Sequence, residues 1–119
     1  IIQLGYVTDE QLKEAYSNAE ALVFPSYYEG FGMPPLESMA CGTPVIASNR
    51  TAIPEILDEA PIYINPSNID SIVDAMSNIL SSPSLRQEHV NKGYKQASQY
   101  RWDHSADDLI KKLLNIAQK

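Results

Sequence analysis

Residues 21–48 constrain the fold more than any other part of the chain. They begin with an apolar run, 21–25, whose length and composition suit a buried strand. A loop with two glycines follows, and then a pair of prolines, which are tolerated in the first turn of a helix. Gly42 ends the predicted helix, and residues 44–47 are a second apolar run. This order predicts a parallel sheet with an anion site at the carboxyl edge of its strands.

The loop before the predicted helix combines donors and acceptors in a small space. The amides of Gly32 and Met33 lie where the helix begins and lack partners within it, so they can donate to a phosphate or to a sugar oxygen. The two glycines of the loop let a ligand approach the main chain closely. Glu29 and Glu37 bracket these amides, and a carboxylate accepts hydrogen bonds from a pair of hydroxyls. The combination suits a sugar nucleotide.

The two glutamates are expected on the same side of the sheet. The loop after the second apolar run also leaves the carboxyl end of a strand, so it should border the same cleft, with Ser48 at its start. For the loop taken alone, a purely structural role without any ligand stays open. Glycine-rich turns are common in α/β domains, and Glu37 can simply complement a helix dipole.

Composition limits the class of protein. The chain has 119 residues, of which 44% are hydrophobic and 20% charged, as in one ordinary domain or part of one. The formal net charge is −6 and there is no basic stripe, so we expect no nucleic acid partner. No apolar run approaches the roughly 20 residues of a membrane span. The single cysteine excludes an intrachain disulfide and fits a reducing compartment, so we expect a cytoplasmic protein.

The rest of the chain continues the alternation of strands and helices. Trp102 is expected to be a packing anchor and His89 a solvated side chain. His104 has no metal-ligand partners at suitable spacing, so no metal site is predicted. The further predicted strands lie at residues 1–4 and 62–64. The further predicted helices cover 9–18, 53–57, 69–80, 83–100 and 102–117, with Thr8 or Asp9 capping the first of them and Ser82 the fourth.

The chain resembles the retaining glycosyltransferases of family four (group 1), which have the GT-B fold. Glu29 and Glu37, eight positions apart and with Gly30-Phe31-Gly32 after the first, look like the signature of that family. Thr51-Ala52 departs from it, because the family usually has glycines there, and a phosphate-cradling role is not carried over to this loop. Further matching segments, in the family's order, are 4–7 with Leu12 and Tyr16, 25–26, 37–47, 53–56 and 100–102.

This resemblance implies an α/β fold with a Rossmann-like parallel sheet, the later part of the C-terminal half of a GT-B fold. Residues 1–119 would form part of the donor-binding domain of an enzyme. That enzyme would move a sugar from a nucleotide-diphosphate sugar to an acceptor, with retention at the anomeric carbon and without a metal or other cofactor. The donor residues that the resemblance implies are Glu29 as the catalytic residue, and Gly30, Phe31, Gly32, Met33 and Glu37 as binding residues.

Some parts of such an enzyme have no counterpart in the chain. They are the first two strands of the donor domain, the Arg/Lys pair on the diphosphate and the N-terminal acceptor domain. We therefore expect a fragment that is inactive alone and can associate with a second copy through a bare sheet edge. The parent protein could also place it at the cytoplasmic face of a membrane. Two alternatives stay open: a sugar-nucleotide epimerase-like domain, which would not need the Glu29–Glu37 pattern, and a non-catalytic interaction module.

Overall fold

The computed structural model describes residues 1–117 as a parallel sheet with helices on both faces. The sheet has three strands in the order β1-β2-β3. Val23 lies opposite Ile46, and Ala47 lies opposite Tyr63. Each connection between neighbouring strands contains a helix, as parallel pairing requires. The predicted α/β fold class is thereby confirmed. The strands are β1 (Leu22–Phe24), β2 (Val45–Ser48) and β3 (Ile62–Ile64).

Side chains cap the first turns of several helices. The Gln11 amide donates to Thr8 Oγ1 at 3.3 Å and the Thr8 amide donates to Gln11 Oε1 at 2.9 Å, which makes a capping box. Ser82 caps the helix that starts at Pro83, as predicted. That helix ends at Ala97, earlier than expected. The helices are α1 (Asp9–Asn18), α2 (Met33–Ala40), α3 (Ile53–Leu57), α4 (Ile69–Ser81), α5 (Pro83–Ala97) and α6 (Trp102–Ala117).

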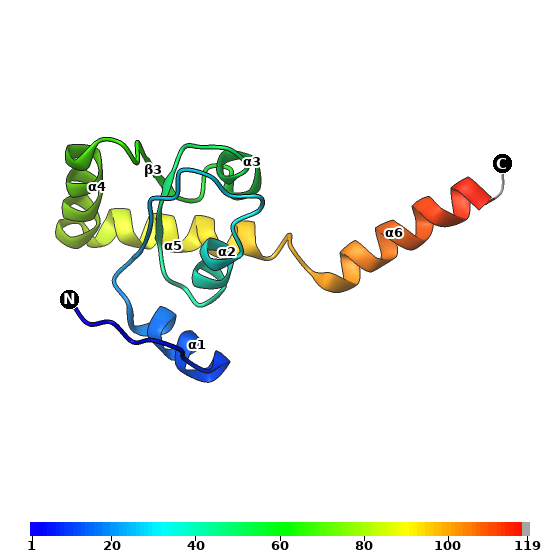
Figure 1. Ribbon diagram of the computed structural model, residues 1–119, viewed down its shortest axis with the longest axis horizontal. Helices are drawn as coiled ribbons and strands as arrows, with labels where there is room; N and C mark the ends of the chain where they lie inside the picture. The colour runs from blue at the N-terminus through cyan, green and yellow to red at the C-terminus, as the bar shows by residue number, and fades with distance from the viewer. Residues whose placement is uncertain (118–119) are drawn as a thin grey trace.

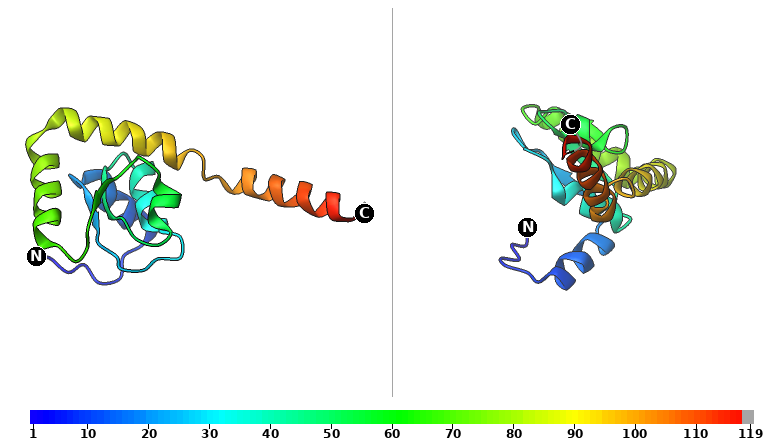
Figure 2. Two further views of the ribbon diagram at one scale, coloured as in Figure 1. Left: turned by 90° about the horizontal axis from the view of Figure 1, so that it is seen from above. Right: turned by 90° about the vertical axis from the view of Figure 1, so that its right-hand side faces the viewer.

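Strand β2 lies at the centre of the core. All four of its residues are buried, and successive side chains point to opposite faces of the sheet. Val45 and Ala47 pack into a cluster with side chains of α2 and α3, whereas Ile46 packs with Ala75 and Ile79 of α4. Figure 2 shows α4 and α5 framing the sheet on two sides. The strand ends are thus held rigidly, and the loops that leave them are positioned by the core.

Helices α2 and α5 approach each other at glycines. An added Cβ at Gly93 would lie 3.0 Å from Met39 Cγ, so α5 can approach α2 this closely only without a side chain there. Gly42 ends α2 with a φ of 81°, as predicted for a helix-terminating glycine, and packs against the Tyr94 hydroxyl. These contacts fix the direction in which the chain leaves α2 for β2.

The N-terminal segment differs from the prediction. Residues 1–4 form no strand, and the side chains of Ile1, Ile2 and Leu4 are exposed. A strand needs a neighbour for its backbone hydrogen bonds, and none lies beside this segment among residues 1–117. Within the same part of the chain, β1 pairs with β2 alone. The predicted bare sheet edge is therefore present, and residues 1–4 do not fill it.

Helix α6 extends away from the rest of the molecule (Figure 1). None of its residues from Trp102 to Ala117 is buried, although one face carries apolar side chains. Within residues 1–117, no helix is both long and apolar enough to cross a bilayer.

Two side chains differ from their expected roles. Trp102 is 84% exposed, so the prediction that it anchors packing is wrong. The physical reason is that α6 leaves the body of the molecule at this residue, so Trp102 borders an open cavity beside α2 and is not enclosed by other side chains. His89 is half-buried instead of solvated, and its Nδ1 lies 2.8 Å from the carbonyl oxygen of Ala60. Helix α5 packs its His89 face against the segment after α3.

Candidate functional site

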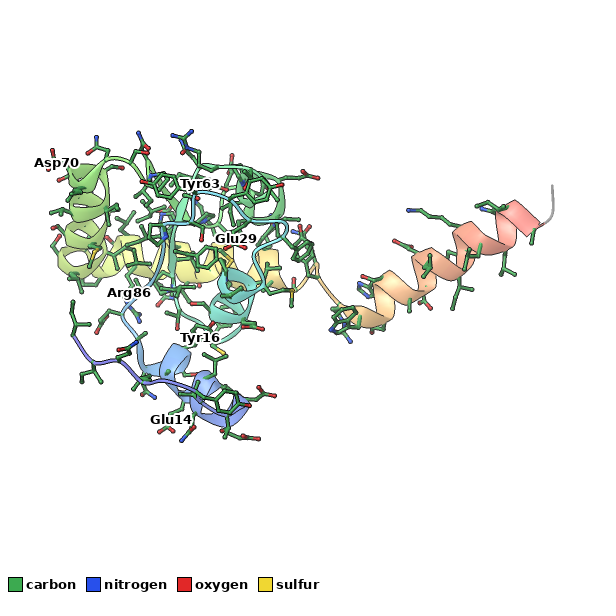
Figure 3. The ribbon with its side chains drawn as sticks, in the orientation of Figure 1. Glu14, Tyr16, Glu29, Tyr63, Asp70 and Arg86 are labelled. Carbon is green, nitrogen blue, oxygen red and sulfur yellow. The ribbon has the colours of Figure 1, made fainter. Side chains whose placement is uncertain are left out.

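The loop between β1 and α2 is held in place at Glu29. The Ser26 hydroxyl donates to Glu29 Oε1 at 3.0 Å. The Glu29 amide donates to Thr51 Oγ1 at 3.0 Å, and the Thr51 hydroxyl donates to the Glu29 carbonyl oxygen at 3.1 Å. The loop that leaves β2 therefore contacts the loop that leaves β1, as expected for neighbouring parallel strands. Figure 3 shows Glu29 among the side chains around the sheet.

The N-terminus of α2 follows this loop directly. Gly32 precedes the helix with a φ of 93°, a conformation that favours glycine, and an added Cβ would lie 2.8 Å from Ile53 Cδ1. Among the described residues no side chain caps this end of α2. Pro34 and Pro35 have no N–H, so the free donors are the amides just before them, at Gly32 and Met33. Such a helix end suits an anionic or hydroxyl oxygen.

Glu37 lies further along α2 and is exposed. The Tyr16 hydroxyl of α1 donates to Glu37 Oε2 at 3.5 Å, a long hydrogen bond. The Thr43 hydroxyl donates to the Tyr16 carbonyl oxygen, which ties the end of α1 to the turn before β2. Partial burial, followed by the negative charge of Glu37, raises the pKa of Tyr16, so its hydroxyl stays protonated at neutral pH.

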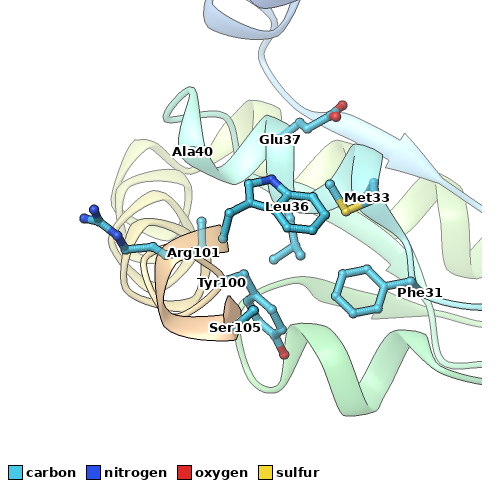
Figure 4. Close-up of a pocket in the computed structure, with 10 residues that line it drawn as sticks. Phe31, Met33, Leu36, Glu37, Ala40, Tyr100, Arg101 and Ser105 are labelled. Atoms are coloured by element: carbon cyan, nitrogen blue, oxygen red, sulfur yellow. The ribbon is translucent and has the colours of Figure 1, made fainter. Parts of the chain in front are cut away.

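A cavity of about 490 Å³ lies between α2 and the start of α6 (Figure 4). Phe31 and Tyr100 meet edge to face there, with ring centroids 5.7 Å apart. The Glu37 carboxylate points away from these rings (Figure 4). Glu29 does not line the cavity, so the two glutamates do not share it. Its main lining side chains are Phe31, Met33, Leu36, Glu37, Tyr100 and Trp102.

The predicted site residues thus fall into one loop and one helix. Residues 29–33 form the loop and the start of α2, and Glu37 follows on the same helix. Ser48, expected at the cleft, is completely buried, and its Oγ has no hydrogen-bond partner within residues 1–117. Thr51 and Tyr16 contact the two glutamates, which was not predicted from the sequence. No local signal could have shown it, because these contacts join residues 22 and 21 positions apart.

Within the described part of the chain, no group of three or more histidine, cysteine, aspartate or glutamate side chains could hold a metal ion.

The arrangement of strand, glycine loop and helix can be compared with known proteins. The family described as "Glycosyl transferases group 1" matches residues 1–96. The chain belongs to the group 1 glycosyltransferases. Among the curated members of this family, the "O-antigen chain mannosyltransferase B" of Escherichia coli is 40% identical over 107 residues, which are 90% of this chain and 28% of that protein. The "O-antigen chain mannosyltransferase RfbU" of Salmonella typhimurium is 46% identical over 80 residues, 67% of this chain and 23% of that protein.

A solved structure supports the same family. The sucrose-phosphate synthase of Thermosynechococcus elongatus is similar with a TM-score of 0.83 and 29% identity, over 95% of this chain and 30% of that one. This similarity confirms the prediction of an α/β domain that forms part of a GT-B fold. This group 1 glycosyltransferase chain spans less than a third of the length of each of these three relatives.

Proposed function

We propose that the chain is the donor-binding part of a retaining glycosyltransferase that moves a sugar from a nucleotide-diphosphate sugar to an acceptor. The observation that carries this proposal is the fixed position of Glu29. Its carboxylate and its main chain are both hydrogen-bonded, immediately before the free amides that open α2. An oriented acceptor next to oriented donors suits a ligand with hydroxyls and a phosphate.

Each part of this loop has a role in the proposal. Glu29 is the catalytic residue and, with the amides of Phe31 and Gly32, holds the donor sugar. Gly30 allows the sugar to approach the main chain, and Met33 contributes the first amide of α2. These amides also stabilise the negative charge that develops on the departing diphosphate. A donor group aimed at that charge is worth most in the transition state, when the charge is largest.

Glu37 binds the two ribose hydroxyls of the nucleotide in this proposal. Its carboxylate is exposed and lies on the side of α2 that faces α1, where Tyr16 donates to one of its oxygens. The second oxygen has no hydrogen-bond partner within residues 1–117, so it is open to a ligand. A carboxylate with two acceptor oxygens matches a pair of neighbouring hydroxyls.

The sugar that we propose is mannose. The support comes from the printed names of the relatives, since those from Escherichia coli and Salmonella typhimurium are called mannosyltransferases. We propose no base for the nucleotide, so an assay has to offer mannose on several nucleotide diphosphates.

In this proposal the chain is part of a larger enzyme. Residues 1–119 would be part of its donor domain, and an acceptor domain and the cations on the diphosphate would lie elsewhere in the whole protein. The short share of each relative that the chain spans supports this. The 119-residue chain alone is then expected to transfer no sugar. We place the whole enzyme in the cytoplasm or at the cytoplasmic face of a membrane.

The test is transfer of mannose by the whole protein, with the anomeric configuration of the product read by NMR. Glu29→Gln should lower kcat on the order of a hundredfold, the scale of a misplaced reacting group. Glu59→Gln is the matched control, because this exposed carboxylate follows α3 and interacts with Lys92 of α5. An inverted product would contradict the retaining mechanism. Conversion of the sugar nucleotide without an acceptor would instead favour an epimerase.

A further inference from the structure

Thr51 has an unusual backbone conformation. Its φ is 51°, in the left-handed region that residues with a branched Cβ rarely adopt. Such a conformation persists only where the surrounding structure determines it strongly. Burial is not the reason here, since Thr51 is exposed. Some other interaction must hold the residue in this position.

The interaction is a pair of hydrogen bonds to a single residue. The Thr51 hydroxyl accepts from the Glu29 amide at 3.0 Å and donates to the Glu29 carbonyl oxygen at 3.1 Å. One hydroxyl thus satisfies both main-chain groups of Glu29 from the neighbouring loop. The side chain of Glu29 has its own partner in Ser26, at 3.0 Å. With main chain and carboxylate both held, Glu29 has little freedom to turn.

We propose that Thr51 is a positioning residue for the donor sugar. By holding the main chain of Glu29, it sets the direction in which the Glu29 carboxylate meets the sugar hydroxyls. Thr51 itself does not touch the ligand. This inference rests on the proposed function of Glu29 and extends it to a residue outside the loop.

Three substitutions in the whole protein separate the hydroxyl from the shape of the side chain. Thr51→Ser keeps the hydroxyl, Thr51→Val keeps the branched shape without it, and Thr51→Gly lacks it and accepts a positive φ without strain. If one variant fails to fold, as judged by thermal unfolding, another variant still tests whether the Thr51 hydroxyl is needed. The probes are mannose nucleotides for turnover and the corresponding free nucleotide diphosphate for binding.

The Val and Gly variants should lose roughly tenfold or more in kcat/KM for the mannose nucleotide, because a small misplacement of a contacting group is costly. The Ser variant should stay within about threefold of the wild type, since it retains both hydrogen bonds. The Kd of the free nucleotide diphosphate should not change in any variant, because Glu29 contacts the sugar only. Hydrogen exchange at the Glu29 amide should be faster than in the wild type in Thr51→Val and Thr51→Gly, and unchanged in Thr51→Ser.

The outcomes separate this inference from the proposed function. If Glu29→Gln inactivates the enzyme while Thr51→Val or Thr51→Gly retains wild-type kcat/KM, the inference on Thr51 is overturned and the role of Glu29 stands. A loss in Thr51→Ser equal to that in Thr51→Val also overturns it. If Glu29→Gln retains full activity, the proposed role of Glu29 fails and the role of Thr51 fails with it. An unchanged Glu29 amide exchange in Thr51→Val contradicts the hydrogen bond itself.

Discussion

The two glutamates have different surroundings, although their spacing makes them look like a pair. Glu29 is half-buried and fixed by Ser26 and Thr51. Glu37 is exposed and has one long hydrogen bond, from Tyr16. A fixed carboxylate suits the group at the reacting sugar, where position decides the rate. An exposed carboxylate with an open oxygen suits a part of the ligand that is bound but does not react.

This difference predicts separate effects on binding. In the whole protein, Glu37→Ala should weaken the binding of the free nucleotide diphosphate by about 1.5–3 kcal/mol, the usual contribution of a hydrogen bond to a charged group. Isothermal titration calorimetry measures it. Glu29→Gln is the control and should leave this affinity unchanged, because the free nucleotide diphosphate lacks the transferred sugar that Glu29 is proposed to hold. An unchanged affinity in a correctly folded Glu37→Ala would remove Glu37 from the nucleotide site.

Tyr63 gives a prediction on pH and stability. Burial, followed by the negative charge of Asp58, raises its pKa from an ordinary value of 10.0 to about 12. Below the ordinary value Tyr63 is neutral in both states and its contribution is complete. Between pH 10 and 12 the unfolded state loses the proton while the native state keeps it, so the free energy of unfolding falls as the pH rises.

Urea denaturation at a series of alkaline pH values tests this. Tyr63→Phe should make the decline in the free energy of unfolding shallower than in the wild type over that range. It should also cost about 1 kcal/mol at neutral pH, because the Tyr63 hydroxyl donates to the Asp58 carbonyl oxygen. Tyr28→Phe is the matched control at an exposed tyrosine and should keep the wild-type slope. Equal slopes for all three proteins would contradict the prediction.

At the scale of elements, the packing of α5 on α2 depends on a missing side chain. Alanine favours a helix interior over glycine by about 0.5–1 kcal/mol, so Gly93→Ala would stabilise an isolated helix. In the folded protein the new Cβ would lie 3.0 Å from Met39 Cγ and 3.3 Å from Met39 Cβ. Met39 is buried and cannot move away freely. The clash should outweigh the helix propensity.

We therefore expect Gly93→Ala to destabilise the protein by about 1–3 kcal/mol, the usual cost of overpacking a core. Urea denaturation measures it. Asn91→Ala, at an exposed position of the same helix, is the control and should change the free energy of unfolding by no more than about 0.5 kcal/mol. A stabilised Gly93→Ala would mean that the two helices separate at little cost.

At the scale of the whole molecule, a strand edge and an apolar helix face are candidates for contact with a second copy. One is the edge of β1, which pairs on one side only within residues 1–117. The other is the apolar face of α6, where Leu109, Ile110, Leu113 and Leu114 are each more than half exposed. Of the two, the strand edge carries backbone donors and acceptors, which favour pairing with another strand.

We predict that the 119-residue chain associates through this edge. Light scattering over a concentration series should show a mass that rises with concentration. The same rise is expected after removal of residues 102–119, because the strand edge remains. A chain that stays monomeric over the whole series contradicts association. Association that disappears with α6 would place the contact on that helix.

Much of the fold followed from local patterns in the sequence. Pro34 and Pro35 marked the start of α2, Gly42 marked its end, and Thr8 and Ser82 marked the starts of two further helices. These signals are local because proline, glycine and capping side chains act on their own turn of the chain. Strands β1 and β2 were predicted from the apolar runs 21–25 and 44–47, which are also local signals. The loop at Glu29, with the amides beside it, was also predicted, because the glycines in it and the prolines after it are local signals.

The tertiary structure alone decided what depends on distant partners. Residues 1–4 have the composition of a strand but no neighbour to pair with among residues 1–117. Trp102 has the character of an anchor but stays exposed, because α6 leaves the body of the molecule there. The ring nitrogen Nδ1 of His89 contacts the carbonyl oxygen of Ala60, which lies 29 positions away in the chain. Thr51 looked like a departure from the family's glycines, yet its hydroxyl holds Glu29 across two loops. Hydrogen bonds of this kind form only after the core has brought the strand ends together, so no pattern along the chain records them.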